Sequence, residues 1–462
     1  MTMNESKKNG HSLDRLNDNP TLPPGSKAPV QWQNFQFYTN SYGYLNNLAK
    51  RYGETFVLQL GGYSSHPYVF FSRPQDVRAV YSLEYSQFVM ENSLLLAIFG
   101  EGSMLLIDRE QHKRDRKLLF PPLHGEEINA LSHLVYQRTV EVFGNIGIGK
   151  TFVASNVIRE ILLYVIVKIV FGERASELYE EIYCLFTKLL DLITFPGDSV
   201  IFFDFLKVDL GAWSPWGRLQ QCRQEIEQLL QREIDKRRQQ GATGKDILSL
   251  TLSTSGQPIN DRELRDELFT LLIGGFESCE SAIAWSLYWI HTLPNVKAKL
   301  LEELDSLGEN PDTMEIFRLP YLTAICNETL RIYPVFEYAS PRKITSSVKI
   351  NQYQFTPGTV LIPCIYLVHH REDLYPQPKE FKPERFLERK YDNSCEFIPF
   401  GGGKRYCLGY ELVNLEMKLV LGAILSRYEF QLASNQTVKP LRRGFVITPS
   451  GGVKMTMTEA RK

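Results

Sequence analysis

Residues 400–409 read Phe-Gly-Gly-Gly-Lys-Arg-Tyr-Cys-Leu-Gly, which places one cysteine after a glycine-rich loop and just before an apolar helical repeat. The helix is expected from the spacing of Leu408, Leu412, Leu415, Val420 and Ile424. Glycine adopts positive φ without steric cost, so the loop can turn sharply and approach a flat group closely. The first N–H groups of a helix have no partner within it and can donate to a sulfur. The pattern predicts that Cys407 offers a single thiolate to a haem iron.

The loop resembles the signature of the cytochrome P450 family, the haem-thiolate monooxygenases, through the pattern Phe-x-x-Gly-x-Arg-x-Cys-x-Gly. The resemblance runs from about Leu22 to Val453. It implies a mainly α fold, in which one large helical catalytic domain with small peripheral β-sheets spans residues 22–462, after a polar tail at residues 1–21. It also implies haem b as the cofactor and Cys407 as the metal ligand.

Other residues of the motif are assigned to the cofactor. Phe400 can cover the sulfur and keep water away. Arg405 precedes the thiolate by two residues, where its guanidinium can pair with a haem propionate through two parallel hydrogen bonds. Gly409 ends the motif as the helix begins. The competing interpretation of the motif is an ordinary buried cysteine after a glycine-rich turn.

Composition excludes several other classes of protein. The chain of 462 residues has a formal net charge of −1, so nothing in its overall charge favours nucleic acid or an anionic membrane as a partner. Its seven cysteines are scattered singly, without a Cys-x-x-Cys pair. This pattern argues against disulfides, zinc ribbons and iron–sulfur clusters, and indicates a reducing compartment.

The N-terminal residues 1–29 contain neither a signal-peptide core nor an apolar run long enough to span a bilayer. Membrane-bound members of the resembled family carry such a helix here, so the chain is expected to be of the soluble bacterial type, nearest in appearance to cyanobacterial members. We therefore expect a cytoplasmic protein, with peripheral membrane contact left open.

Strand-like segments are few. Residues 55–60 and 68–72, separated by Gly61-Gly62, predict a small hairpin, and further strands are expected within 348–361 and 445–457. The polar segment 239–245, with two glycines, predicts a surface loop between helices. Most of the remaining chain has helical periodicity.

A long apolar helix is expected from Asn260 to about His291, with Asn260 and Glu263 as a capping pair. Its centre reads Gly274-Gly275-Phe276-Glu277-Ser278. Two glycines inside a helix lower its stability by roughly 1 kcal/mol each relative to alanine. Glycines in this position would allow a flat cofactor and a diatomic ligand to lie close to the backbone. They are also a place where a helix can bend or open.

Ser278 stands four residues after Gly274, so its hydroxyl can bond the Gly274 carbonyl. A hydroxyl beside a carboxylate suits proton delivery to bound dioxygen, and Ser278 and Glu277 are the predicted catalytic residues. The family usually has threonine at the position of Ser278. The serine is therefore expected to affect coupling efficiency, which is the share of electrons that end in product rather than in peroxide. The competing interpretation is a buried helix with glycines for close packing.

Two sets of charged residues follow from the resemblance. Glu328 and Arg331 match the family's Glu-x-x-Arg motif and, with Arg385 of Pro-Glu-Arg-Phe, imply a structural triad that locks the loop carrying Cys407. His112, Arg116 and Arg342 match propionate contacts. Without the resemblance, residues 109–117 would be interpreted as a solvated charged surface.

Three stretches are more hydrophobic than loops usually are: 94–99, 195–216 and 335–339. In the family such stretches line the cavity above the haem, which implies a hydrophobic small-molecule substrate, a fatty acid or terpenoid. The residues predicted to line it are Leu95, Phe99, Phe276, Phe336, Tyr338 and Ile447. The competing interpretation is that most of these side chains belong to the core.

No flavin or ferredoxin segment is present in the sequence, so electrons are expected from a ferredoxin or flavodoxin with its reductase. A basic patch of Lys113, Arg114, Lys117 and Lys404 would suit such an acidic partner. Two alternative functions stay open at this point. One is a peroxide-using or hydroperoxide-rearranging haem-thiolate enzyme, and the other is a non-catalytic haem sensor.

Overall fold

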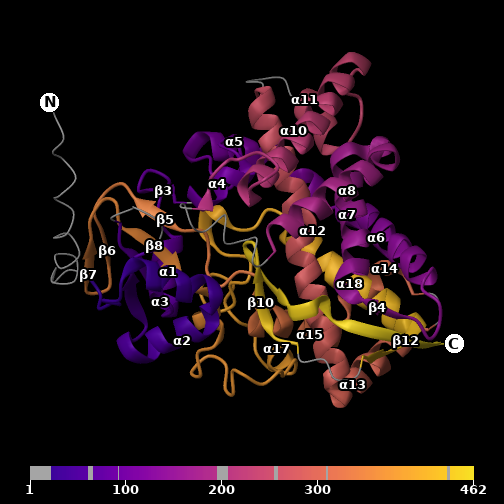
Figure 1. Cartoon of the computed structure of the whole chain (residues 1–462). Helices are drawn as coiled ribbons and strands as arrows, with labels where there is room; N and C mark the ends of the chain where they lie inside the picture. The colour runs from indigo at the N-terminus through magenta and orange to yellow at the C-terminus, as the bar shows by residue number, and fades with distance from the viewer. Residues whose placement is uncertain are drawn as a thin grey trace. The chain divides into compact units, whose positions relative to one another are not determined.

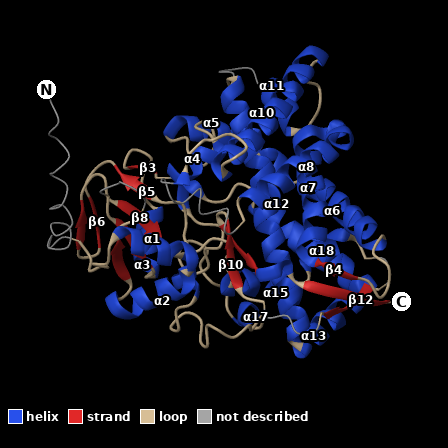
Figure 2. Ribbon diagram, viewed as in Figure 1, coloured by secondary structure: helices blue, strands red, loops and turns tan. Residues whose placement is uncertain are grey.

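The computed structural model describes residues 22–60, 66–91, 93–194, 206–253, 259–308, 311–433 and 438–461. The chain divides into two compact units. Unit 1 comprises Met1–Asn92, Glu337–His369 and Asp392–Tyr406, and unit 2 comprises Ser93–Phe336, His370–Tyr391 and Cys407–Lys462. The polar tail predicted at residues 1–21 lies outside the described residues. Helices predominate, and the strands form small separate groups (Figure 2).

Unit 1 contains a five-stranded sheet of order β1-β2-β8-β5-β3. The strands are β1 (Thr55–Leu58), β2 (Tyr68–Phe71), β3 (Phe88–Met90), β5 (Arg342–Ile344) and β8 (Val360–Pro363). β2 and β8 run parallel and the other pairs are antiparallel. Every residue of β1, β2 and β8 is buried, which explains why these strands are apolar without alternation. The predicted hairpin is confirmed as β1 and β2.

The described residues of unit 1 also form four α-helices and a second hairpin. The helices are α1 (Val30–Thr39), α2 (Ser41–Tyr52), α3 (Pro74–Tyr81) and α16 (Ile365–His369). The hairpin pairs β6 (Val348–Ile350) with β7 (Tyr353–Phe355). The segment predicted as strand-like over 348–361 is thus three strands, β6, β7 and the start of β8. α3 buries Val77 and Val80 and contacts β8, so it is fixed on the sheet.

Unit 2 is largely helical. Its helices are α4 (Ser93–Phe99), α5 (Arg109–Leu119), α6 (Glu127–Gly144), α7 (Ala154–Phe171), α8 (Ala175–Leu192), α10 (Pro215–Gln240), α11 (Ile247–Ser253), α12 (Asp261–Thr292), α13 (Pro294–Asp305), α14 (Thr313–Arg318), α15 (Pro320–Ile332), α17 (Arg385–Glu388) and α18 (Tyr410–Arg427). The long helix α12 contacts α7, α10, α15 and α18 (Figure 1). It is therefore the central helix of the unit.

The bounds of α12 have local causes. The Asn260 side chain accepts a hydrogen bond of 2.9 Å from the Glu263 N–H, which caps the N-terminus. The helix ends just before Pro294, whose ring disfavours helical geometry in the preceding residue. Between these ends α12 continues through Gly274-Gly275 without a break, so the two glycines do not interrupt the helix.

Two small sheets lie in unit 2. One has the order β4-β12-β9, from β4 (Thr151–Val153), β12 (Lys454–Ala460) and β9 (Tyr428–Leu432), and the other pairs β10 (Pro440–Arg443) with β11 (Val446–Pro449). Strands were expected within 445–457, and β11 and β12 occupy that range. The predicted loop at 239–245 is confirmed from Gly241 onward, between α10 and α11.

Candidate active site

The glycine-rich loop preceding Cys407 lies in unit 1 and packs on Tyr81 at the end of α3. A Cβ atom at Gly402 would collide with the Tyr81 ring, and one at Gly403 with the Tyr81 carbonyl oxygen. Gly403 also has φ +63°, a conformation that other residues adopt at a cost. Close packing on Tyr81 is therefore one reason for glycine at these two positions.

Arg342 of β5 holds the same loop from another side. Its Nη2 donates a hydrogen bond of 2.9 Å to the Gly402 carbonyl, and its guanidinium lies 4.9 Å from the centre of the Tyr81 ring. Arg342 is 1% exposed, and among the residues that the structure describes its Nη1 has no hydrogen-bond partner. Burial, with a smaller effect from the Arg405 cation, lowers the pKa of Arg342 to about 10. A buried guanidinium beside a second cation is costly unless an anion pairs with it.

Cys407 belongs to unit 2 and precedes α18 by three residues. Its side chain is neither fully buried nor exposed. Desolvation raises the pKa of the Cys407 thiol, whereas the backbone N–H of Gly409 and the Arg116 cation lower it. The residue before α18 thus supplies a hydrogen-bond donor and α5 supplies a positive charge to a thiolate, and a bound metal cation would have to overcome the remaining cost of desolvation.

The two predicted propionate contacts in unit 2 lie one turn apart on α5. His112 is buried and Arg116 is partly exposed. The Arg116 guanidinium lies 5.8 Å from the centre of the Phe120 ring, next to the residues that join α5 to α6. Spacing of four residues places His112 and Arg116 on one helical face, as the prediction requires.

The central helix α12 has one open stripe. Between Leu264 and Leu287 most residues are buried, and the exceptions are Arg265, Leu271, Gly274, Gly275 and Ser278. Three of these, Leu271, Gly274 and Ser278, are spaced by three and four residues, which puts them on a single face. An added Cβ at Gly274 would meet no atom within 4 Å, whereas one at Gly275 would collide with Ile166 of α7. The two glycines therefore differ: Gly275 permits helix packing, and Gly274 leaves space.

Ser278 lies on this stripe, and its hydroxyl donates to the Gly274 carbonyl at 3.3 Å, as predicted. Glu277 faces elsewhere, into a buried cluster of charges. Arg443 Nε of β10 lies 3.7 Å from Glu277 Oε1, and Arg443 Nη1 lies 3.0 Å from Glu280, which also pairs with Arg159 at 2.8 Å. Burial raises the pKa of Glu277 to about 7. The predicted acid and alcohol are neighbours in sequence but leave the helix on different faces.

The residues present fit a haem in three respects. Within the described residues no three His, Cys, Asp or Glu side chains gather to hold a metal ion, and Cys407 belongs to no such group. Haem iron needs only one protein ligand, because the porphyrin supplies four donors. Within unit 2 the open stripe at Gly274 can face a flat group. Within unit 1, taken by itself, the buried Arg342 Nη1 can donate to a carboxylate.

The sequence model of the family described as "Cytochrome P450" matches residues 22–457. The chain belongs to the cytochrome P450 family. Its similar relatives include cytochrome P450 138 of Mycobacterium tuberculosis, 28% identical over 441 residues that cover 94% of this chain and 96% of the relative. Cytochrome P450 135B1 of the same organism is 29% identical over 448 residues, covering 95% and 92%. The names of these relatives state the family and no substrate.

Among solved structures, the cyanobacterial P450 CYP120A1 with bound retinoic acid matches with a TM-score of 0.84 at 21% identity. The match covers 95% of this chain and 99% of that one. It confirms the predicted P450 fold. P450 proteins carry haem with a cysteine thiolate ligand, and this is the cofactor of the chain. Among the described helices, none combines the length and the apolar character needed to cross a bilayer.

The structure brings the predicted P450 triad together within unit 2. Arg331 donates to both oxygens of Glu328 at 2.7 and 2.8 Å, and Arg385 Nε donates to Glu328 at 3.1 Å. Glu328 and Arg331 are fully buried. Further hydrogen bonds join the triad to the carbonyls of residues 376, 378 and 380 and to the N–H of Lys382.

The triad therefore fixes the segment 376–385 directly. The triad was also predicted to lock the loop that carries Cys407. It would have to do so indirectly, through the residues between this segment and the loop.

The predicted substrate residues have different surroundings. In unit 2, Phe99 lies 5.8 Å from Phe269 and Phe276 lies 6.3 Å from Phe186, as ring centroids. The Ile447 backbone is held between the Val335 carbonyl, which accepts its N–H, and the Ser281 hydroxyl, which donates to its carbonyl.

The other predicted lining residues are less uniform. Leu95 is partly exposed, Phe336 is 42% exposed, and Tyr338 packs on Phe37 and Phe70 of unit 1. Tyr338 is partly exposed, so these contacts place it at the edge of the unit 1 core. Residues 195–205 of the predicted hydrophobic stretches lie outside the described residues.

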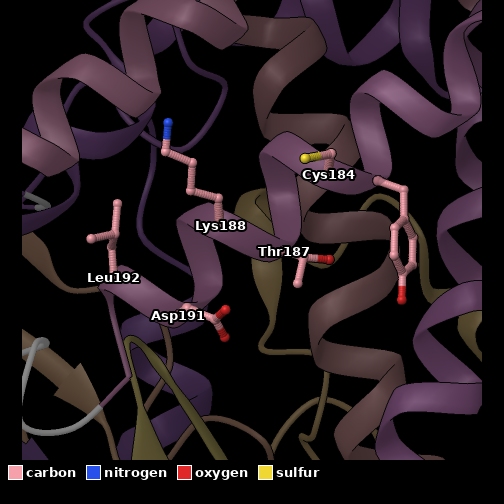
Figure 3. A pocket seen from close by; sticks show the side chains of 6 residues that line it. Cys184, Thr187, Lys188, Asp191 and Leu192 are labelled. Atoms are coloured by element: carbon pink, nitrogen blue, oxygen red, sulfur yellow. The ribbon is translucent and has the colours of Figure 1, made fainter.

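A surface depression of about 550 Å³ lies along α8. Figure 3 shows side chains of that one helix around it, and its lining residues are Tyr183, Cys184, Thr187, Lys188, Asp191 and Leu192. Lys188 pairs with Glu225 at 2.7 Å. None of the predicted substrate residues belongs to this depression.

Sequence reasoning missed several residues around the site. Arg443 faces Glu277, yet in the sequence it appears only as a charged residue beside a strand. Asp266 and Glu267 are buried in α12, where two adjacent acids in an apolar repeat could have drawn attention. Glu416 of α18 is also fully buried, and burial raises its pKa to about 8. Acidic residues at positions that hydrophobic periodicity assigns to the buried face of a helix were the available signal. An analysis of the periodicity alone does not single them out.

Proposed function

We propose that this P450 inserts one atom of dioxygen into an unactivated C–H bond of a hydrophobic substrate, with electrons from a separate redox protein. The observation that carries the proposal is the Ser278 hydroxyl on the open stripe of α12, in a chain that has the cysteine loop of the family. A peroxide-using or rearranging enzyme has no need of a proton donor for dioxygen.

When bound, a haem with a thiolate ligand supplies the chemistry of O–O cleavage and C–H oxidation. The chain's own residues prepare that site. The Cys407 thiolate would ligate iron and accept a hydrogen bond from the Gly409 N–H. Arg342, whose Nη1 has no described partner, would bind a propionate, together with Arg405. Phe400 would exclude water from the sulfur, and Gly274 would leave space for dioxygen.

Proton delivery is assigned to Ser278. Its hydroxyl donates to the Gly274 carbonyl at rest and can rotate to donate toward the open side of the helix. Glu277, with a pKa raised to about 7 by burial, exchanges protons near neutral pH. Because Glu277 pairs with Arg443, a proton from it would reach Ser278 through water or after the carboxyl group turns.

For the substrate we propose a fatty acid or a terpenoid. The aromatic rings of Phe99, Phe186, Phe269 and Phe276 form a connected buried cluster in unit 2, which would give a neighbouring substrate site an apolar wall suited to an elongated hydrocarbon. The similar cyanobacterial P450 holds retinoic acid, an isoprenoid carboxylic acid, which supports the same class.

For the electron donor we propose an acidic ferredoxin or flavodoxin with its reductase. Lys117 is exposed, and Lys113 is exposed although it pairs with Glu110. Arg114 is largely covered by its ion pairs with Asp115 and Glu263, which reduces its share of the basic patch. A reducing compartment such as the cytoplasm is supported by the seven free cysteines.

The test is turnover under labelled dioxygen. Holoprotein with a reconstituted ferredoxin system, NADPH and ¹⁸O₂ should hydroxylate a fatty acid or terpene chosen by its shift of the haem spectrum. We expect one ¹⁸O atom in each product molecule. Turnover with peroxide but not with NADPH and the redox partner would overturn the monooxygenase proposal. Spectral binding without product under both conditions would favour a sensor.

Replacing Ser278 by alanine should uncouple the reaction. Substrate and carbon monoxide binding should stay unchanged, because binding does not use the hydroxyl. The product formed per NADPH should fall by about two orders of magnitude, the lower end of the effect of losing a general acid, with hydrogen peroxide released instead. Ser278→Thr is the matched control, since it keeps the hydroxyl and restricts χ1. An unchanged product-to-NADPH ratio in the alanine variant would remove Ser278 from proton delivery.

A further inference from the structure

A buried histidine in unit 1, His369 at the end of α16, bonds the segment that leads to Cys407. Its Nε2 accepts a hydrogen bond of 2.9 Å from the N–H of Ile398. Both residues are 0% exposed. The imidazole also stacks on the Phe397 ring, with 5.4 Å between the ring centres and 25° between the ring planes. An imidazole that accepts at Nε2 is neutral and carries its proton on Nδ1, so the bond to Ile398 selects one tautomer.

The element that carries His369 is itself held on the five-stranded sheet. Cys364 joins β8 to α16, and its N–H donates to the Phe71 carbonyl of β2 at 2.8 Å. The Tyr366 N–H donates to the Glu337 carbonyl at 3.0 Å, and every residue of α16 is buried. A side chain on an element held in this way has little freedom, so it can fix the place of its partner.

The segment before Ile398 has a second, weaker attachment at its start. Arg78 of α3 pairs with Asp392 at 2.5 Å, but both side chains are exposed. The Asp392 carbonyl accepts hydrogen bonds from the N–H groups of Glu396 and Phe397 at 2.8 and 3.0 Å. Because an exposed ion pair contributes little to stability, the bond from Ile398 to His369 is the more effective anchor.

Ile398 also begins the turn that carries Phe400. The Gly401 N–H donates to the Ile398 carbonyl at 3.0 Å, which closes a turn with Pro399 and Phe400 at its two corners. The N–H of Ile398 is thus bonded to His369 and its carbonyl to Gly401. The position of His369 therefore determines where the turn begins, and with it the direction of the Phe400 side chain.

Removing the imidazole would leave Ile398 with a buried N–H and no acceptor. Such a group is costly, and the cost can be relieved only if the segment moves until the N–H meets water. Since the turn starts at Ile398, that movement would also displace Phe400. The bond from His369 is in this way connected to the side chain that is proposed to keep water from the sulfur.

We propose that His369 is a positioning residue for the thiolate ligand: it fixes Ile398, and through the turn at 398–401 it sets how well Phe400 covers the sulfur of Cys407. His369 takes no part in the chemistry. A thiolate that water can reach accepts more hydrogen bonds and donates less charge to the iron, which raises the reduction potential. The inference rests on the covering role proposed for Phe400, and it assumes nothing about the substrate or the redox partner.

The experiment compares three variants of the holoprotein with the wild type. His369→Leu removes the acceptor and keeps an apolar side chain of similar size. His369→Gln keeps an acceptor, because the amide oxygen can take the place of Nε2. His291→Leu is the matched control, since the His291 imidazole of α12 bonds the Leu287 carbonyl of its own helix at 2.7 Å. All proteins are measured without substrate or redox partner.

Three readouts are needed, and none uses turnover. Hydrogen exchange of the Ile398 amide reports the bond, and the iron–sulfur stretching frequency and the reduction potential report the thiolate. We expect His369→Leu to raise both the exchange rate and the equilibrium constant for reduction by about fivefold, the equivalent of one neutral hydrogen bond, and to lower the stretching frequency. His369→Gln should restore all three values, and His291→Leu should leave them at those of the wild type.

The inference is wrong if exchange at Ile398 is unchanged in His369→Leu. It is also wrong if exchange rises while the stretching frequency and the potential stay constant, because His369 would then be a core residue only. Restored exchange without a restored potential in His369→Gln would likewise reject the route through Ile398.

If His369→Leu does not retain haem, His369→Asn takes its place. The asparagine amide is polar but one carbon shorter than that of glutamine, so it does not reach the Ile398 N–H, and we expect the same shifts. Failure of the labelled-dioxygen experiment leaves these readouts unaffected and rejects only the monooxygenase proposal.

Discussion

Cys407→Ser should abolish the strongly red-shifted Soret band of the reduced carbon monoxide complex. That band requires a thiolate ligand, and a serine hydroxyl does not ionise at neutral pH without far stronger stabilisation. In the protein, burial already raises the pKa of the Cys407 thiol, so the Gly409 N–H and the iron must together favour the thiolate. An oxygen in that position keeps the hydrogen bond but loses the electron donation of sulfur.

The measurement is the difference spectrum of reduced protein with and without carbon monoxide, normalised to haem content. Cys184→Ser is the matched control, because Cys184 is exposed on α8 and should leave the spectrum unchanged. Persistence of the band in Cys407→Ser at normal haem content would show that another group ligates the iron.

Glu328→Ala should yield little or no haem-loaded protein. The change removes the one carboxylate that pairs with both Arg331 and Arg385, and Arg331 has no exposed surface through which water could compensate. Breaking a buried pair in this way costs about 3–5 kcal/mol, a large part of the stability of a typical domain. Carbonyl groups at 378 and 380 still accept hydrogen bonds from Arg331, but they carry no full charge.

The yield of holoprotein and the midpoint of urea unfolding are the two measurements. Glu141→Ala is the matched control, since Glu141 pairs with Arg138 at the same three-residue spacing but is largely exposed. That variant should lose at most about 1 kcal/mol. Normal holoprotein yield from Glu328→Ala would show that the triad is dispensable.

The triad also illustrates what spacing can predict. Glu328 and Arg331 lie three residues apart in an apolar helix, so their pairing and burial follow from the helical period. The contact with Arg385 joins residues more than fifty positions apart, and only the resemblance suggested it. The carbonyls at 376–380 that complete the set could not be predicted, because any backbone carbonyl looks alike in a sequence.

In the central helix α12, too, some features follow from the sequence and others only from the tertiary structure. Its bounds and its apolar character follow from Asn260, Pro294 and the periodicity between them, and the hydrogen bond from Ser278 to Gly274 follows from their spacing. The different roles of Gly274 and Gly275 depend on which face meets Ile166 of α7. Periodicity within one helix cannot identify the partner of each face.

The sequence by itself determined the family, the mainly α fold, the cysteine-ligated haem and the local pairs, because each depends on residues close together in the chain or on a motif with several constant positions. Only the tertiary structure decided that Glu277 faces Arg443 rather than Ser278, that Gly402 and Gly403 pack on Tyr81, and that His369 bonds the N–H of Ile398. These contacts join segments far apart in sequence. Their existence depends on how the elements pack, which local propensity does not encode.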